Sequence, residues 1–162
     1  MQTSKKLLAL DFDGVLHSYT SGWKGPRTIP DPPVPGALEF LTNAVTRFDV
    51  HIFSSRSRYI GGRWAMRRWL RDWYLRSDTI DNEWWSDFVS DYAIDLGGDS
   101  MAPWDANVRG AIDFILDRIE FPKYKPPAHV TIDDRAIPFV GIWPTPEAIE
   151  SFSPWRVPRF KW

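Results

Sequence analysis

The sequence contains no cysteine, which excludes disulfide bonds and thiolate chemistry and leaves oxygen and imidazole as the side-chain ligands for any metal. Long apolar runs are also missing. Leu7 to Leu10 is too short for the core of a signal peptide, and no later stretch approaches the roughly 20 apolar residues of a membrane span. We therefore expect a soluble, cytoplasmic protein with no membrane partner.

Net charge is nearly absent, at -1 for the whole chain. Such a chain has no overall field to hold it on nucleic acid or an anionic membrane, so any such binding must come from a local patch. No repeat or low-complexity tract occurs. The 162 residues, 43% of them hydrophobic, are enough for one compact domain, and we expect residues 1–162 to form it. No stable protein partner is evident, and the oligomeric state is left open.

Short apolar segments alternate along the chain with segments of helical periodicity. Residues 17–36 are rich in proline and glycine and form a predicted loop, whereas 77–104 have no sustained period and form a predicted insertion with one or two short helices. The alternation predicts an α/β fold in three layers, a Rossmann-like parallel sheet with helices on both faces. We expect strands at 6–12, 49–53 and 128–132, a further short strand at 139–143, and helices at 37–48, 61–74, 107–119 and 145–152.

The middle of the chain is unusually rich in tryptophan and arginine. Six of the ten tryptophans lie between Trp64 and Trp104, and we expect them to pack in the core. Arg63, Arg67 and Arg71 recur every four residues and would repel one another on one face of a helix. Two explanations stay open for this row: acidic residues in the segment 78–95 answer its charge, or a phosphate-rich ligand does.

Polar residues follow each of the three main expected strands. Because the carboxyl ends of parallel strands meet at one edge of a sheet, we expect these side chains to converge. Carboxylates brought so close repel one another unless a cation lies between them, and a set of oxygen ligands suits Mg²⁺. The residues concerned are Asp11 and Asp13 at the end of the first strand, Ser54 and Arg56 after the second, and Asp133 and Asp134 after the third.

Such a site supports phosphoryl transfer through a covalent intermediate. An aspartate such as Asp11 can attack phosphorus to give an aspartyl-phosphate, which divides hydrolysis into two easier steps. Asp13 can protonate the leaving oxygen and later deprotonate the attacking water. The hydroxyl of Ser54 and a lysine would hold the phosphoryl oxygens as charge develops on them.

Four motifs occur along the chain in a fixed order. They are Asp11-Phe12-Asp13-Gly14-Val15, the apolar run His51-Ile52-Phe53-Ser54, the lysine-bearing Lys125-Pro126-Pro127-Ala128 and the acidic Thr131-Ile132-Asp133-Asp134-Arg135. Together they resemble the motifs of the haloacid dehalogenase superfamily of phosphatases. The first motif alone would be weak evidence, because Asp and Gly are common in turns. The ordered set of four is much more specific, although residues 77–104 have no counterpart in it.

The resemblance implies roles for individual residues. Asp11 would be the nucleophile and Asp13 the general acid/base. The magnesium ion would contact the Asp11 carboxylate, the backbone carbonyl of Asp13 and the side chain of Asp134, with Asp133 in support.

The resemblance also indicates how a phosphate would bind, through Ser54, Lys125 and Arg56, with Lys123 as a rival to Lys125. Arg56, two residues after Ser54, is placed as in members that act on nucleotide or polynucleotide ends. One loop and one helix separate the first two motifs, which is too little for a large lid domain. An open, small-lid site would admit a nucleotide or a nucleic-acid end, so we expect a nucleotidase-like phosphomonoester hydrolase.

Two other functions stay open. The chain could be a phosphatase of small metabolites or phosphoproteins. It could also be a binding module without catalysis, in which the helix at 61–74 and the basic tail at 155–162 engage nucleic acid or a protein. Among the histidines, His51 and His129 are expected to be structural. His17 is left open between a structural role and one facing the substrate, and no histidine has the spacing of a zinc site.

Overall fold

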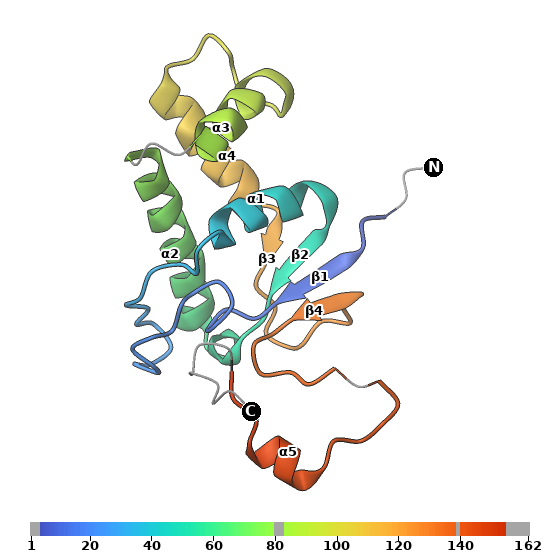
Figure 1. Ribbon diagram of the computed structural model, residues 1–162. Helices are drawn as coiled ribbons and strands as arrows, with labels where there is room; N and C mark the ends of the chain where they lie inside the picture. Colours follow the sequence, from blue (N-terminus) through green and yellow to red (C-terminus); the bar gives the residue numbers. More distant parts are fainter. Residues whose placement is uncertain (1–3, 80–82, 139, 155–162) are drawn as a thin grey trace.

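A sheet of four strands organises the computed structural model, which describes residues 4–79, 83–138 and 140–154 (Figure 1). All neighbouring strands pair in parallel, in the order β3-β2-β1-β4, so the predicted α/β class with a parallel sheet is confirmed. The elements are β1 (Leu7–Leu10), α1 (Ala37–Arg47), β2 (Asp49–Ile52), the 3-10 helix η1 (Ser55–Arg58), α2 (Ile60–Thr79), α3 (Glu83–Asp95), α4 (Trp104–Leu116), β3 (Ile119–Glu120), β4 (Val130–Ile132) and α5 (Pro146–Glu150).

Strand β1 lies between β2 and β4, and its last residue, Leu10, is in register with both Ile52 and Ile132. The pairing continues one residue beyond the strands. The backbone N–H of Asp11 donates to the carbonyl of Ile132 at 2.9 Å, and that of Phe53 donates to the carbonyl of Leu10 at 3.0 Å. The residues that follow the three strands therefore start from neighbouring points on one edge of the sheet.

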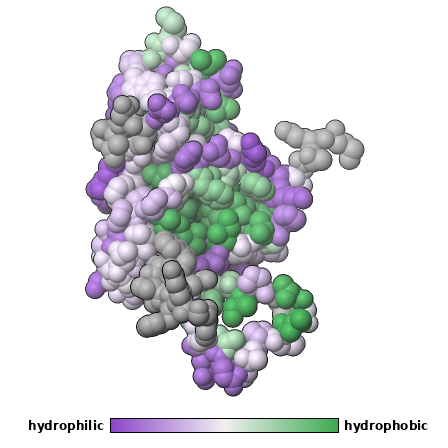
Figure 2. All heavy atoms as spheres, viewed as in Figure 1, coloured by the Kyte–Doolittle hydropathy of each residue, from purple (hydrophilic) through white to green (hydrophobic). Residues whose placement is uncertain are grey.

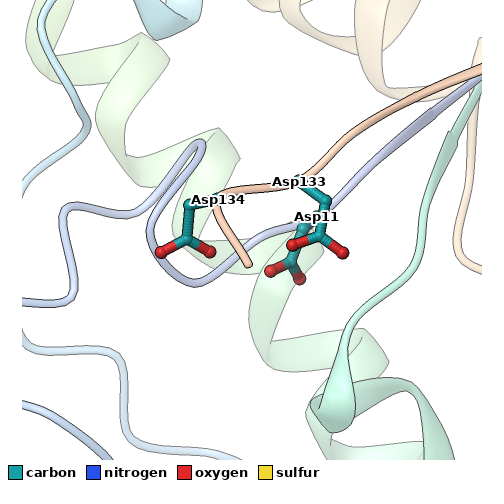
Figure 3. Close-up of side chains that lie close together, drawn as sticks. All are labelled: Asp11, Asp133 and Asp134. Carbon is teal, nitrogen blue, oxygen red and sulfur yellow. The ribbon is translucent and has the colours of Figure 1, made fainter. Parts of the chain in front are cut away.

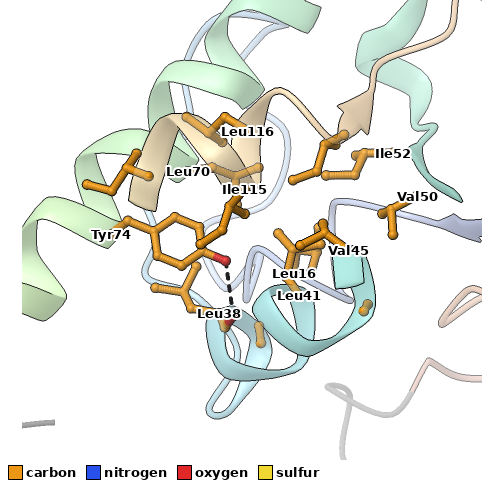
Figure 4. Packing of buried hydrophobic residues seen from close by; sticks show 14 of the residues in the cluster. Leu16, Leu38, Leu41, Val45, Val50, Ile52, Leu70, Tyr74, Ile115 and Leu116 are labelled. Atoms are coloured by element: carbon orange, nitrogen blue, oxygen red, sulfur yellow. Dashed lines mark hydrogen bonds between the residues drawn. The ribbon is translucent and has the colours of Figure 1, made fainter. Parts of the chain in front are cut away.

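The predicted periodicity of the helix after the first loop is confirmed in α1. Leu38, Leu41 and Val45, spaced three and four residues apart, are all buried. Figure 4 shows these residues packed against the strands and against α2 and α4, with the Tyr74 hydroxyl donating to the carbonyl of Leu38 at 3.0 Å. The loop and the first helix are thereby joined to the core that supports the strand ends.

The helices that enter the core cluster meet one face of the sheet. Leu8 and Leu10 of β1 point to the same side as Val50 and Ile52 of β2, and all four belong to a cluster with residues of α1, α2, α3 and α4. The three-layer arrangement with helices on both faces therefore stays a prediction. On β4 every residue is exposed, and Figure 2 shows a hydrophobic area over the strands.

Two predicted element boundaries were wrong in the second half of the chain. The helix predicted at 107–119 begins at Trp104 and ends at Leu116, and Ile119 belongs to β3. Ile119 lies four residues after Ile115, which is a helical spacing. In the structure, however, Ile119 is buried in the sheet, where it is in register with Val50 of β2. Residues 77–104 contain α3, within the expected one or two helices, although α2 extends to Thr79 and so into that segment.

The short strand predicted at 139–143 is wrong for residues 140–143, which form no strand and bend at 141–142, while Phe139 lies outside the described residues. Val140, Ile142 and Trp143 are exposed, and Gly141 has a φ of 89°, which interrupts an extended backbone. The predicted last helix is confirmed as α5. The basic tail at 155–162 lies outside the described residues.

The tryptophan prediction holds for four of the six residues. Trp69 and Trp85 are buried, and Trp73 and Trp84 pack against the core. It is wrong for Trp64 and Trp104, which are exposed.

For Arg67 and Arg71, the acidic partners predicted for the arginine row were also wrong. Arg67 pairs with Asp117 and Arg71 with Asp113, each at 2.7 Å, so the described partners lie on or just after α4 and not in the segment 78–95. Helix α4 packs beside α2 in space although it is distant in sequence. In the part of the chain that the structure describes, no helix is long and apolar enough to cross a membrane.

Candidate active site

Three of the predicted carboxylates come together at the carboxyl edge of the sheet. One oxygen from each of Asp11, Asp133 and Asp134 lies within 4.8 Å of the other two. Figure 3 shows Asp11 and Asp133 side by side, at the ends of the adjacent strands β1 and β4, with Asp134 on the next turn of chain. The expected convergence of the first and fourth motifs is therefore present, in a form that suits a hard cation.

The Asp11 carboxyl group responds to this crowding. Burial raises its pKa from 3.8 to about 7; the backbone N–H of Phe12 opposes the rise with a hydrogen bond of 2.7 Å, and the charges of Asp133, Asp13 and Asp134 add to it. A cation between the carboxylates would favour the ionised form of Asp11. The arrangement thus favours either a proton or a metal ion at Asp11.

Asp13 is buried and held by two donors. Arg56 Nε donates to Oδ1 at 3.1 Å and to Oδ2 at 2.9 Å, and His17 Nδ1 lies 2.8 Å from Oδ1. Gly14, which follows Asp13, has a φ of 94°, and this lets the chain turn so that the backbone N–H of Gly14 meets the carbonyl of His17 at 2.8 Å. This tight loop holds the His17 ring next to the Asp13 carboxyl group.

His17 has a structural place and does not line the pocket, which answers the question that the sequence left open. Its ring is fully buried between Phe12 and Trp69. The backbone N–H of Asp31 donates to His17 Nε2 at 3.2 Å, so this nitrogen is the acceptor and Nδ1 carries the proton that reaches Asp13. Asp31 in turn accepts from Ser21, so the Pro-rich loop is linked to the acid/base candidate.

Ser54 is positioned by the start of η1. Its hydroxyl oxygen accepts from the backbone N–H of Arg56 at 3.2 Å, and its own backbone N–H donates to Ser57 Oγ at 3.1 Å. This reciprocal capping box fixes the Ser54 rotamer. Because the oxygen is the acceptor there, the hydroxyl hydrogen is available to a ligand.

A pocket of about 220 Å³ joins these residues. Asp11, Asp13, Ser54 and Asp133 line it, as the sequence analysis expected of converging strand ends. The other lining residues were not predicted for the site: Tyr19, Phe53, Ser55 and Arg135.

Arg135 and Tyr19 form one wall of the pocket, with the guanidinium carbon 5.8 Å from the centre of the tyrosine ring. The sequence did carry a signal for Arg135, because it directly follows the acidic pair of the fourth motif. Tyr19 has a φ of 57°, which is unusual for a bulky residue and was not visible in the sequence.

Two predicted phosphate ligands, Lys125 and Arg56, are not among the residues that line the pocket. Lys125 is exposed and, like Lys123, is not among the residues that line the pocket. Arg56 is fully buried; besides Asp13, its Nη1 donates to the carbonyls of Gly25, Pro26 and Thr28 at 2.8, 3.1 and 3.1 Å. Arg56 therefore holds Asp13 and the Pro-rich loop together, and its contact with a phosphate stays a prediction.

Comparisons with known proteins give no guide to the function of this site. A scan against protein-family models and searches of curated proteins and of solved structures found no match to this chain. What can be argued of its chemistry therefore depends on the arrangement of its own residues.

Proposed function

We propose that the protein is a magnesium-dependent phosphomonoester hydrolase that works through an aspartyl-phosphate on Asp11, as in the haloacid dehalogenase superfamily. The observation that carries this proposal is the meeting of Asp11 with Asp133 and Asp134 at the edge of a parallel sheet, beside a pocket that Asp11, Asp133 and Ser54 line. The three-layer fold with a small lid belongs to the same proposal. Its substrate would be a nucleotide or the terminal phosphate of a nucleic acid.

In the first step an Asp11 oxygen bonds to phosphorus while the bond from phosphorus to the leaving oxygen breaks. Asp13 gives a proton to that oxygen. In the second step a water oxygen bonds to phosphorus, the bond to Asp11 breaks, and Asp13 takes the proton of the water. The contacts of Asp13 with Arg56 and His17 suit its ionised form in the second step, so the first step requires Asp13 to turn or exchange one donor.

The carboxylates of Asp11, Asp133 and Asp134 would hold Mg²⁺, which when bound supplies positive charge against the phosphoryl oxygens. Their oxygen-only chemistry suits this ion, and one oxygen of each lies within 4.8 Å of the other two. The hydroxyl of Ser54 would donate to one phosphoryl oxygen. Arg135, which also lines the pocket, offers a positive charge there, whereas Lys125 does not line the pocket.

The test is hydrolysis of p-nitrophenyl phosphate with and without Mg²⁺ by the wild type and by Asp11→Asn. We expect Mg²⁺ to stimulate the wild type, a chelator to abolish the activity, and Asp11→Asn to lower kcat by about 10³-fold or more, since it removes the nucleophile. Asp91→Asn is the matched control, because Asp91 is an exposed residue of α3. An Asp11→Asn protein as active as this control would refute the proposed function.

A further inference from the structure

Exposed aromatic and basic residues gather on the surface beside η1. Trp23, Tyr59 and Trp64 are 45%, 51% and 60% exposed, which is unusual for side chains of this size. Lys24, Arg27 and Arg58 are exposed among them. We call the six residues Trp23, Lys24, Arg27, Arg58, Tyr59 and Trp64 the basic aromatic strip.

The strip comes from two separate segments, and contacts at Arg56 and Gly61 bring these segments together. The guanidinium of Arg56 lies 4.8 Å from the centre of the Trp23 ring while it binds carbonyls of the same loop. The side chain of Arg27 lies directly over Gly61, where a Cβ would collide with it. The loop that carries Trp23 and Arg27 is therefore fastened to the start of α2.

The charge of this surface is of one sign. Residues 14–30 and 50–71 contain no aspartate or glutamate. Arg56, Arg67, Arg68 and Arg71 have acidic partners from other parts of the chain. Within residues 4–79, 83–138 and 140–154, no ion pair is formed by the remaining cations of these segments, which are Lys24, Arg27, Arg58 and Arg63.

One segment of the strip follows a pocket residue closely along the chain. Ser55 lines the pocket and is the first residue of η1, which ends at Arg58 and is followed by Tyr59. At the other end of the strip, the guanidinium carbon of Arg68 lies 5.3 Å from the centre of the Trp64 ring, and Arg68 follows Trp64 by about one turn of α2. A chain whose end entered the pocket would meet the aromatic rings and cations in succession.

We propose that the basic aromatic strip binds single-stranded nucleic acid and guides its phosphorylated end into the pocket. Bases of any sequence stack on exposed aromatic rings, and cations beside them neutralise the backbone phosphates. A duplex hides the faces of its bases, so it cannot use the rings. The guiding role depends on the proposed function, whereas the binding itself does not.

The test measures binding without turnover, with Asp11→Asn protein and fluorescent oligonucleotides of about ten nucleotides without terminal phosphates. Oligo-deoxythymidine and oligo-uridine are the single-stranded DNA and RNA probes, and a blunt DNA duplex and polyglutamate are the comparison probes. We expect fluorescence anisotropy to show binding of at least one single strand at low salt, weakening as salt rises. The duplex and polyglutamate should bind at least about tenfold more weakly.

Variants locate the site on the strip. Trp23→Ala and Trp64→Ala should each weaken binding about tenfold, through loss of stacking. Arg27→Gln and Arg58→Gln should each weaken binding. Each should also make the negative slope of log affinity against log salt shallower by about 0.7. Arg109→Gln, an exposed change on α4, serves as the matched control and should have no effect.

The proposal is overturned if no single strand binds, if the duplex or polyglutamate binds as tightly, or if the strip variants behave like Arg109→Gln. These outcomes are independent of the proposed function. If oligonucleotides bind as expected but the wild type lacks magnesium-stimulated phosphatase activity, the strip stands and the enzyme proposal fails. If phosphatase activity is present but the strip variants bind oligonucleotides as tightly as the parent protein does, the enzyme proposal stands and the strip proposal fails.

Discussion

On the β1 and β2 side of the pocket, Asp13 and Ser54 are buried and fixed by hydrogen bonds, whereas Asp133 and Arg135 on the β4 side are exposed. The first side is supported from beneath by the core cluster, and β4 is joined to the sheet by its pairing with β1. The carboxyl group of Asp13 and the hydroxyl group of Ser54 are thus held in place before any ligand arrives. A ligand bound by both Asp11 and Asp133 would join the two sides and stabilise the folded state by mass action.

The largest effect expected from the difference between buried and exposed groups is a change in stability. It compares two arginine–aspartate pairs, one buried and one exposed. Arg56→Met should lower the free energy of unfolding by about 3 to 5 kcal/mol, since it leaves the buried Asp13 without its cation. Arg109→Met removes the exposed pair with Asp105 on α4 and should change stability by no more than about 0.5 kcal/mol. Urea unfolding measures both. Equal losses from the two variants would contradict the preorganised side of the comparison.

The second prediction compares neighbours in the sheet. Leu10 and Ile132 are in register on β1 and β4, yet Leu10 is 1% exposed and Ile132 is 40% exposed. Leu10→Ala should cost about 2 to 5 kcal/mol because it leaves a cavity in the core. Ile132→Ala should cost only about 1 kcal/mol, since part of its side chain already lies in solvent. A loss for Ile132→Ala as large as that for Leu10→Ala, again in urea, would show that β4 is as well supported as β1.

The smallest expected effect is a pH dependence at the junction of the two sides. The pKa of Asp11 is raised to about 7, so protons would compete with the proposed Mg²⁺ for its carboxylate below that pH. Magnesium affinity, measured by calorimetry, should rise about tenfold between roughly pH 6 and pH 8. Asp11→Asn should bind more weakly and without this dependence. A wild-type affinity independent of pH would contradict the environment assigned to Asp11.

Stability of the metal-free protein gives a second measure of the same group. The folded-state pKa of Asp11 lies above the usual aspartate value of 3.8, so the folded protein holds the proton more firmly than the unfolded chain does. This contribution is fully present below about pH 4 and is lost as pH rises through about 7. Asp11→Asn removes it, so the wild type should lose stability relative to this variant across that range.

Local pattern was enough to predict the elements that carry the site. β1 and β2 are short apolar runs that end in polar residues, and α1 repeats leucine and valine at helical spacing, so each signal lies within a few adjacent residues. Because parallel strands meet at one edge, the approach of Asp11 to Asp133 and Asp134 followed from the class of fold.

What the sequence could not predict depends on long-range contacts. The ion pair of Arg56 with Asp13 joins residues that are 43 positions apart, and the partners of Arg67 and Arg71 lie further along the chain. The two-residue strand β3 escaped detection because Ile119 continues the spacing of α4. In each case packing in three dimensions decided what the local pattern left open.

The central claim is that Asp11 carries a phosphoryl group during turnover. Brief mixing of the wild type with a radiolabelled phosphomonoester and Mg²⁺, followed by acid quenching and peptide mapping, tests it most directly. The account predicts a label on the peptide that contains Asp11, released by hydroxylamine as expected for an acyl phosphate, and no label on Asp11→Asn. Turnover of the substrate without any label on this peptide, or an equal label on Asp11→Asn, would contradict it.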